Sequence, residues 1–388
     1  MRRLLFVFGT RPEAIKLAPL IRETRRRSGF EVVVCVTGQH REMLDQVLDV
    51  FDIVPDVDLQ VMRPDQTLFD ITADVLRGLE GVLDRFSPDL VIVQGDTTTA
   101  LAGALAAYYT RTPVAHVEAG LRTGDKYSPY PEEMNRALVD VLSDVHLAPT
   151  EHARCNLLRA GVENDRIHVT GNTVIDALLW ARDRIEAAGS ADAAIGEQLS
   201  RIPRGLRERI AEDAGRRLIV VTGHRRESFG PDFEAICHAL RLIAERNPEV
   251  ELAYAVHLNP AVRTPVYRIL DGVDRVHLFD PPPYLAFVWL LTRCRFVLTD
   301  SGGIQEEAPS LGKPLLVMRR VTERPEGVEA GCARVVGVGT DDILSAAERL
   351  LHDEEEYARM SNVANPYGDG TASAQTADVL WEWLRAHV

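Results

Sequence analysis

The sequence predicts an α/β protein of two domains, each built on a parallel sheet with helices on both faces. Its 388 residues exceed what one ordinary core accommodates and suit two domains of under about 200 residues each. Short apolar runs alternate with amphipathic helical patterns, which is typical of parallel strands joined by helices. This alternation is interrupted once, near the middle of the chain, and then resumes. We therefore expect a cleft between the two domains.

The first half of the chain contains five apolar runs that we interpret as strands. The first, residues 4–8, follows a basic start, but it is too short for a secretion signal and leads directly into a Gly-Thr-Arg-Pro turn. The other four cover residues 31–37, 90–94, 113–118 and 144–148. These patterns predict an N-terminal domain over residues 1–172, in a protein that stays cytoplasmic.

The second half repeats the architecture but not the sequence. Between residues 187 and 217 the chain loses β-branched residues and gains charge and glycine, and the run Leu-Ile-Val-Val-Thr at 218–222 then begins a second sheet. Further strands are expected at residues 251–256, 275–279, 295–299 and 315–318. The second domain is predicted over residues 173–365. The segment 366–388 contains a final helix with an apolar stripe, which we expect to pack back toward the N-terminal domain.

Composition excludes several classes of partner. The formal net charge of -14 and the pI near 5.3 argue against nucleic acid and anionic membranes, because both require a basic field. No stretch approaches the roughly 20 apolar residues of a membrane span. The five cysteines are odd in number, widely spaced and set in apolar or helical surroundings, so we interpret them as buried thiols.

Several cofactor motifs are missing from the sequence. Neither sheet begins with the G-x-G-x-x-G fingerprint of dinucleotide binding, and Gly312-Lys313 lacks the upstream glycine of a phosphate-binding P-loop. There is no H-E-x-x-H, no paired C-x-x-C and no D-x-D at a spacing that would bind a metal. We therefore expect no cofactor and no metal, and any phosphate must be held by cations and backbone amides.

The first predicted strand ends in a loop that carries two cations, Arg11 and Lys16, beside the start of a helix. Taken alone, Gly9-Thr10-Arg11-Pro12 is more often a capped helix with solvated side chains. Ligands of open α/β sheets, however, bind beyond the carboxyl ends of the strands, and this position favours a functional role.

Two later strands each end in a carboxylate, Asp96 and Glu118. If the strands are adjacent and parallel, both acids face one crevice, where like charges favour protonation of one of them. Asp96 has an alternative role as the N-cap of the helix beginning at Thr97, whereas Glu118 has none. Glu132 stands in a first helical turn, where an acid can simply complement the helix dipole.

In the second half, two strands lead into loops suited to an anion. Gly223-His224-Arg225-Arg226 presents two guanidinium groups, whose planar forks match phosphate, although a lone histidine is usually structural. Ser301-Gly302-Gly303 lets backbone N–H groups approach a diphosphate at a helix N-terminus. Glu307 could accept hydrogen bonds from ribose hydroxyls and Arg324 could close over the phosphates, though both also suit a plain surface.

Together these strings resemble those of non-hydrolysing UDP-N-acetylglucosamine 2-epimerases over nearly the whole chain. The matching strings, in the order of the family, are GTRPEAIK, GQHREMLDQV, GDTTT, HVEAGLRTGD with PEEMNR, TGNTVID, GHRRES, TDSGGIQEEAPSLGKP and TERPE. The resemblance implies two Rossmann-like domains in the arrangement of GT-B glycosyltransferases, with the nucleotide held mainly by the C-terminal domain and the active site in the cleft. It also implies a homodimer.

The resemblance assigns roles to individual residues. The family's catalytic acids fall on Asp96, Glu118 and Glu132, with His224 beside the leaving phosphate and Arg11 and Lys16 in the same site. The positions that contact UDP are Ser301, Gly302, Gly303, Glu307 and Arg324, with Phe287 packing on the uracil. The positions of an activator site, where bacterial relatives bind UDP-N-acetylglucosamine beside the substrate, are Gln39, Arg225 and His257. The chain departs locally from the family pattern at Arg320-Val321, at the three prolines 281–283 and at Cys332.

The resemblance implies reversible interconversion of UDP-N-acetylglucosamine and UDP-N-acetylmannosamine. Since the C2 hydrogen lies next to no carbonyl, elimination of UDP followed by its re-addition is the expected route. The alternatives are a GT-B glycosyltransferase, which would need an acceptor pocket, and a non-catalytic sensor of UDP-sugars. A sensor would have no use for three acids together.

Overall fold

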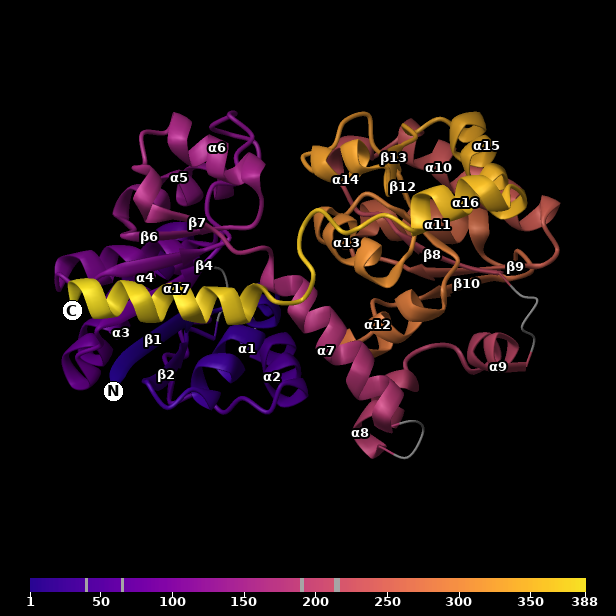
Figure 1. Ribbon diagram of the computed structural model, residues 1–388. Helices are drawn as coiled ribbons and strands as arrows, with labels where there is room; N and C mark the ends of the chain where they lie inside the picture. The colour runs from indigo at the N-terminus through magenta and orange to yellow at the C-terminus, as the bar shows by residue number, and fades with distance from the viewer. Residues whose placement is uncertain (39–40, 64–65, 189–191, 213–216) are drawn as a thin grey trace. The chain divides into compact units, whose positions relative to one another are not determined.

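A computed structural model describes residues 1–38, 41–63, 66–188, 192–212 and 217–388 (Figure 1). The chain forms two compact units. Unit 1 comprises Met1–Ala177 and Tyr367–Val388, and unit 2 comprises Leu178–Pro366. Each unit contains one parallel sheet with helices, which confirms the predicted fold class.

Unit 1 is built on a seven-stranded sheet of order β3-β2-β1-β4-β5-β6-β7, in which every pair is parallel. The strands are β1 (Arg2–Phe8), β2 (Phe30–Val36), β3 (Val57–Asp58), β4 (Leu90–Gln94), β5 (Val114–Val117), β6 (Val145–Ala148) and β7 (Ile167–Val169). The sequence predicted five of them and missed the edge strands β3 and β7, which are too short to show a period. The strand order reverses between β1 and β4, and such a switch point is where open α/β sheets bind ligands.

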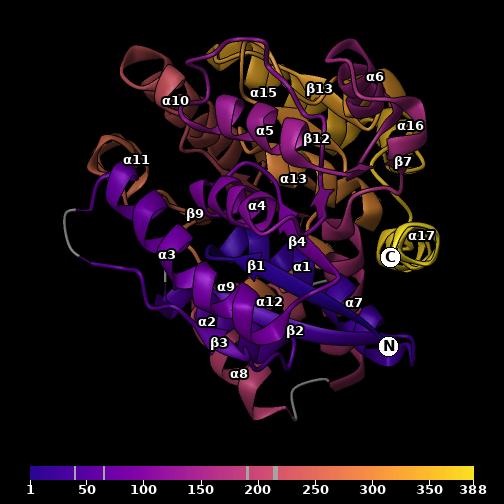
Figure 2. The same ribbon diagram turned by 90° about the vertical axis from the view of Figure 1, so that its left-hand side faces the viewer.

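The helices of unit 1 form two layers around this sheet. They are α1 (Arg11–Arg26), α2 (Arg41–Val50), α3 (Leu68–Phe86), α4 (Thr98–Tyr109), α5 (Glu132–Leu142), α6 (Glu151–Arg159), the first turn of α7 (Thr173–Ala188) and α17 (Ala372–His387). Helices α3, α4 and α5 pack side by side on one face, while α1, α2 and α17 pack on the other (Figure 2).

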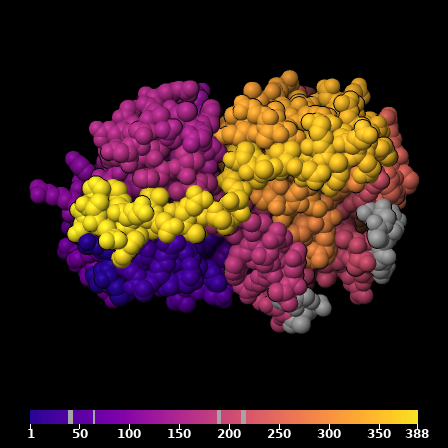
Figure 3. Space-filling view, in the orientation of Figure 1, coloured from indigo at the N-terminus to yellow at the C-terminus, as the bar shows by residue number. Residues whose placement is uncertain are grey.

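The C-terminal helix α17 lies along the surface of unit 1 as the yellow rod in Figure 3. Its Leu380 and Leu384 are fully buried, and Trp381 meets Phe30 edge to face at 5.5 Å between ring centroids. Arg27 of the α1 C-cap donates to the carbonyl of Ala374 at 3.1 Å. The apolar stripe seen in the sequence thus anchors the end of the chain to α1.

Unit 2 has a six-stranded parallel sheet of order β10-β9-β8-β11-β12-β13. Its strands are β8 (Arg217–Thr222), β9 (Val250–Ala255), β10 (Val276–Phe279), β11 (Phe296–Thr299), β12 (Leu315–Val317) and β13 (Ala333–Val335). The order reverses between β8 and β11, so the loops that follow these two strands meet at the switch point. The three-residue strand β13 was missed from the sequence.

The helices of unit 2 vary widely in length. They are α7 beyond its first turn, α8 (Ala193–Leu199), α9 (Arg204–Glu212), α10 (Pro231–Arg246), α11 (Pro260–Leu270), α12 (Tyr284–Arg293), α13 (Gly302–Glu307), α14 (Pro325–Ala330), α15 (Thr340–His352) and α16 (Glu354–Ser361). Helices α10, α11 and α15 close the main apolar core over β8, β9 and β11. Across the described parts of both units, no helix has the length and apolar character needed to span a bilayer.

Candidate active site

In unit 1, Asp96 and Glu118 lie at the carboxyl ends of neighbouring strands, because β4 pairs directly with β5. The two acids are brought together as expected, but the sequence did not show that the guanidinium of Arg136 on α5 lies between them. Arg136 Nη2 is 2.5 Å from Asp96 Oδ2 and 3.4 Å from Glu118 Oε1. Its Nη1 donates to the backbone carbonyl of Glu118. One buried cation therefore binds both acids.

Glu118 is held in an uncommon conformation. Its φ of +65° lies in the left-handed region, which costs a residue with a side chain about 1–2 kcal/mol, and such strain is often found at functional sites. The side chain is buried, and Oε2 pairs with Lys16 Nζ of α1. Asn172 Nδ2 donates to the same oxygen at 3.3 Å. The carboxylate is thus fixed by groups from three separate elements.

The alternative structural role of Asp96 is wrong, because Thr97 is the N-cap of α4 and accepts a hydrogen bond from the amide of Ala100. The half-buried side chain of Asp96 instead forms an ion pair with Arg136. Glu132 is the first residue of α5, one turn before Arg136 and therefore on the same face of the helix. Its neighbour Glu133 has a different role, since it accepts hydrogen bonds from the loop at Arg122 and binds no group of the acid pair.

Glu13 ties together the two loops that carry Arg11 and Asp96. Its buried carboxylate accepts the amides of Gly9 and Thr10, at 3.0 and 2.7 Å, and the hydroxyl of Thr97 at 2.6 Å. Burial raises the pKa of Glu13, while these hydrogen bonds oppose the shift. Arg11 comes directly after Thr10 and is the first residue of α1. Sequence reasoning missed Glu13, Arg136 and Asn172 because their roles depend on partners far away in the chain.

In unit 2, His224 and Arg225 follow β8, and Asp300 follows β11 at the switch point. Asp300 Oδ2 accepts the backbone amides of both residues, at 2.7 and 2.8 Å, and Oδ1 lies 3.3 Å from His224 Nδ1. Burial is the main cause that lowers the pKa of His224, and the charge of Asp300 opposes it. The buried carboxylate therefore fixes the loop, whereas burial of the ring favours the neutral imidazole.

Two guanidinium groups converge on the start of α13. A Cβ added at Gly302 would lie 3.7 Å from Arg324 Nη2 and 3.8 Å from Arg225 Nη2. Arg324 is oriented by Glu306, whose Oε1 accepts from Nε at 2.5 Å. Ser301 is the N-cap, and its hydroxyl makes no hydrogen bond to the first amides of the helix. Two cations and the first amides of the helix thus surround the space in front of Gly302.

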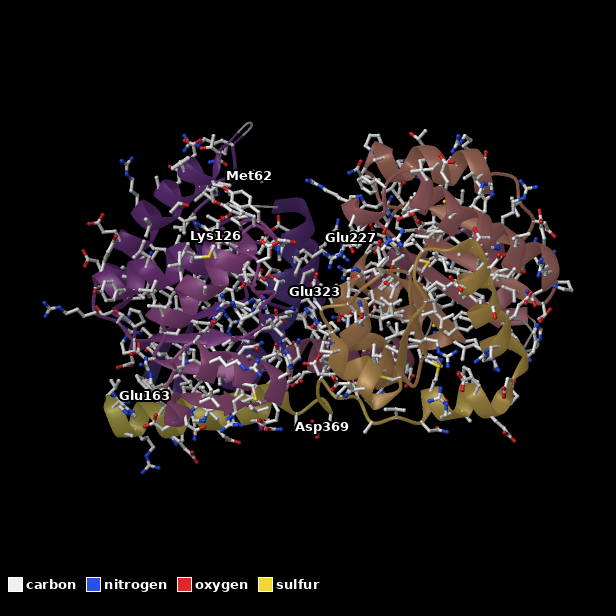
Figure 4. All side chains as sticks on the ribbon, turned by 90° about the horizontal axis from the view of Figure 1, so that it is seen from above. Met62, Lys126, Glu163, Glu227, Glu323 and Asp369 are labelled. Carbon is white, nitrogen blue, oxygen red and sulfur yellow. The ribbon has the colours of Figure 1, made fainter. Side chains whose placement is uncertain are left out.

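Arg319 is a further residue that the sequence did not reveal. Its buried guanidinium lies 2.6 Å from Glu227 and 3.2 Å from Glu323, two residues labelled in Figure 4. Glu227 follows Arg225 closely in the chain and Glu323 precedes Arg324. Arg319 therefore links the loops that carry Arg225 and Arg324.

The remaining candidate residues lie on other elements of unit 2, or outside the described part of the chain. Glu307 is buried in α13, and Phe287 is partly exposed on α12. His257, after β9, stacks on His224 with 5.4 Å between ring centroids. Gln39 lies outside the described residues. Within the described residues there is no group of three or more acidic, histidine or cysteine side chains placed to hold a metal ion.

Comparison with known proteins places this architecture in one family. The family model for UDP-N-acetylglucosamine 2-epimerase matches residues 22–381. The UDP-N-acetylglucosamine 2-epimerases of Salmonella typhimurium and Escherichia coli K12 are 55% and 56% identical over 378 residues, covering 97% of this chain and 98% of each relative. The crystal structure of the Neisseria meningitidis enzyme bound to UDP-N-acetylglucosamine is 45% identical, with a TM-score of 0.88 over 98% of this chain and 100% of that chain. The chain therefore belongs to the UDP-N-acetylglucosamine 2-epimerase family of isomerases.

Proposed function

We propose that the protein interconverts UDP-N-acetylglucosamine and UDP-N-acetylmannosamine by eliminating UDP and adding it back. The observation that carries this proposal is the cluster of Asp96, Glu118, Lys16 and Arg136 at the carboxyl ends of β1, β4 and β5. Two carboxylates with two cations suit proton transfer at a sugar carbon, and neither a glycosyltransferase nor a UDP-sugar sensor requires them. The family relatives, including one bound to UDP-N-acetylglucosamine, support the substrate.

The first step breaks the C1–O bond, and its electron pair leaves with UDP. Ser301, Gly302 and Gly303, with Arg324, are the proposed ligands of the diphosphate, because a preorganised set of donors stabilises charge as it develops. His224 and Arg11 assist the same departure, and a neutral imidazole can donate one N–H to a phosphate oxygen. Glu307 is proposed to bind the ribose and Phe287 to pack on the uracil.

The second step removes the C2 proton. Departure of UDP leaves an oxocarbenium-like carbon at C1, which acidifies C2, so a carboxylate takes the proton and the C2–H electrons form the C1=C2 bond of 2-acetamidoglucal. A second acid then protonates the opposite face of C2 while UDP attacks C1. Two faces require two groups, which is why Asp96, Glu118 and Glu132 are proposed together. Arg136 and Lys16 keep the charge of the site balanced while the proton moves.

Turnover in heavy water tests the route. Incubation with UDP-N-acetylglucosamine alone should yield the epimer with solvent deuterium at C2 and the original hydrogen at C1. An oxygen label in the bridging position should scramble into the non-bridging phosphate oxygens, since the C1–O bond breaks. Retention of the C2 hydrogen in both epimers would overturn elimination, slow hydrolysis would favour a glycosyltransferase, and no reaction would favour a sensor.

Variants test the residue assignment. Asp96→Asn, Glu118→Gln and Glu132→Gln are each expected to lower turnover by a factor on the order of 100 or more, as for loss of acid–base assistance. Affinity for UDP should change little, because its proposed ligands belong to unit 2. Wild-type turnover in two of the three variants would overturn the assignment.

A second, regulatory role is proposed for Gln39, Arg225 and His257. The stacking of His257 on His224 favours it, because a ligand at His257 would then influence the ring proposed to face the leaving phosphate. An activator can act only by binding the active state better than the inactive one. Reaction from pure UDP-N-acetylmannosamine should start with a lag that traces of UDP-N-acetylglucosamine abolish. A linear start under continuous removal of UDP-N-acetylglucosamine would exclude the switch.

We also propose a homodimer. Apolar side chains are exposed at the carboxyl ends of the neighbouring helices α4 and α5: Tyr108 and Tyr109 are 61% and 68% exposed, and Val141 is 79% exposed. Exposed apolar patches often mark protein interfaces. Light scattering coupled to size exclusion should give twice the mass of the chain, and a monomer at micromolar concentration would contradict the proposal.

A further inference from the structure

His116 is a fully buried histidine in the middle of β5, and the proposed chemistry does not use it. Its Nδ1 lies 2.7 Å from Asp140 Oδ1 of α5, and its Nε2 lies 2.7 Å from the backbone carbonyl oxygen of Gly95. The ring therefore joins α5 to the end of β4, one residue before Asp96.

The partners of the ring settle the direction of one hydrogen bond. A carbonyl oxygen only accepts, so Nε2 must carry the hydrogen in the bond to Gly95. The contact between Nδ1 and Asp140 Oδ1 needs a hydrogen of its own, and it orients the imidazole, as a carboxylate does for histidines in many sites. The other charged or titratable groups that face the pair are Arg136 on α5, whose charge acts on Asp140, and His146 on β6, whose Nε2 lies 2.8 Å from the Asp140 carbonyl.

The hydrogen bond to Gly95 matters because Gly95 immediately precedes Asp96. Gly95 has a φ of +70°, a turn that brings Asp96 out of the strand. Its amide donates to the carbonyl of Val117 at 3.0 Å, and the carbonyl of Asp96 accepts from Asn135 Nδ2 at 3.0 Å. Together with the hydrogen bond from His116 to the Gly95 carbonyl, these bonds fix the backbone on both sides of Asp96 to β5 and α5.

We propose that His116 is a positioning residue for the reaction: its Nε2–H holds the Gly95–Asp96 peptide so that the Asp96 carboxylate keeps its place beside Arg136. This inference rests on the proposed catalytic role of Asp96. His116 contacts no reacting atom and transfers no proton, since its bond ends on a carbonyl oxygen. Its contribution is geometric, and a displacement of about 1 Å of a catalytic group can cost on the order of 100-fold in rate.

Two amide variants separate positioning from packing. In His116→Gln the side-chain nitrogen reaches about as far as Nε2 and can still donate to Gly95, whereas in His116→Asn it replaces Nδ1 and can donate only toward Asp140. Both variants remove the same buried ring. We expect His116→Asn to lower kcat on the order of 10- to 100-fold with KM unchanged, and His116→Gln to keep kcat within about threefold of the wild type.

Equal losses of kcat in the two variants, at equal losses of thermal stability, would overturn the proposal and leave His116 a packing residue. If His116→Asn does not fold, His116→Gln decides alone, because a 100-fold loss there contradicts positioning through Nε2. A measurement on the wild type needs no variant: NMR of the protein labelled with ¹⁵N-histidine should show a slowly exchanging Nε2–H for His116, and an unprotonated Nε2 would overturn the proposal.

The parallel variant Asp96→Asn distinguishes failure of this inference from failure of the proposed function. Wild-type turnover in Asp96→Asn would overturn the catalytic role of Asp96 itself. A strong loss in Asp96→Asn, combined with wild-type turnover in His116→Asn, would leave the function intact and overturn only the positioning role.

Discussion

Replacing Arg136 by methionine should destabilise unit 1 strongly. The guanidinium is 6% exposed and binds Asp96, the backbone carbonyl of Glu118 and the Glu118 carboxylate, which is itself 5% exposed. Removing one partner of a buried ion pair costs about 3–5 kcal/mol, because the other charge stays buried and uncompensated. Glu118 keeps Lys16 and Asn172, so we expect the lower part of this range.

Urea denaturation followed by circular dichroism measures the effect. With an m-value of about 2–3 kcal/mol/M, a loss of about 3 kcal/mol lowers the midpoint by about 1–1.5 M. Arg136→Lys keeps the charge but not the planar fork of donors, so it should recover part of the stability and little of the turnover. The turnover of both variants is measured by deuterium incorporation at C2.

A matched control is Arg154→Met in the same unit. Arg154 lies 3.3 Å from Glu151 in a pair whose side chains are 31% and 72% exposed, and such surface pairs contribute about 0–1 kcal/mol. If Arg136→Met is no less stable than Arg154→Met, the inference that Arg136 compensates the buried acids is refuted. If it is unstable but turns over normally, Arg136 is structural and its role in charge balance is refuted.

Three further predictions concern unit 2. Arg324→Ala should raise the Kd for UDP about 10- to 100-fold in calorimetric titration, because a hydrogen bond to a charged group contributes about 1.5–3 kcal/mol; unchanged affinity would remove it from the site. Gly302→Ala should fold normally, since the added Cβ meets no atom closer than 3.7 Å, yet bind UDP more weakly; Gly205→Ala, with nothing within 4 Å, is the control that should bind normally. Because burial lowers the pKa of His224 below its ordinary 6.5, the unfolded chain binds more protons there at mildly acidic pH. The wild type should therefore lose thermal stability relative to His224→Gln as the pH falls from about 7 to 5, and parallel melting temperatures over that range would contradict this.

The two parallel sheets, and the candidate site residues at the carboxyl ends of their strands, could be predicted from the sequence. Strand runs such as residues 90–94 and 218–222 are buried on both faces, so they appear as continuous apolar segments whatever their neighbours are. The polar residues that follow them, Asp96 and His224, stand at carboxyl ends of strands, where open sheets bind ligands. These are local features, and a local pattern is sufficient to find them.

Only the tertiary structure determined which side chains contact these site residues. Arg136 meets Asp96 across 40 positions of the chain, and Asn172 meets Glu118 across 54. Whether an arginine on an amphipathic helix faces solvent or two buried acids depends on how α5 packs on β4 and β5, and the helical period is the same in both cases. The edge strands β3 and β13, of two and three residues, were missed for a related reason. A segment of that length becomes a strand only through hydrogen bonds to a neighbouring strand that is distant in sequence.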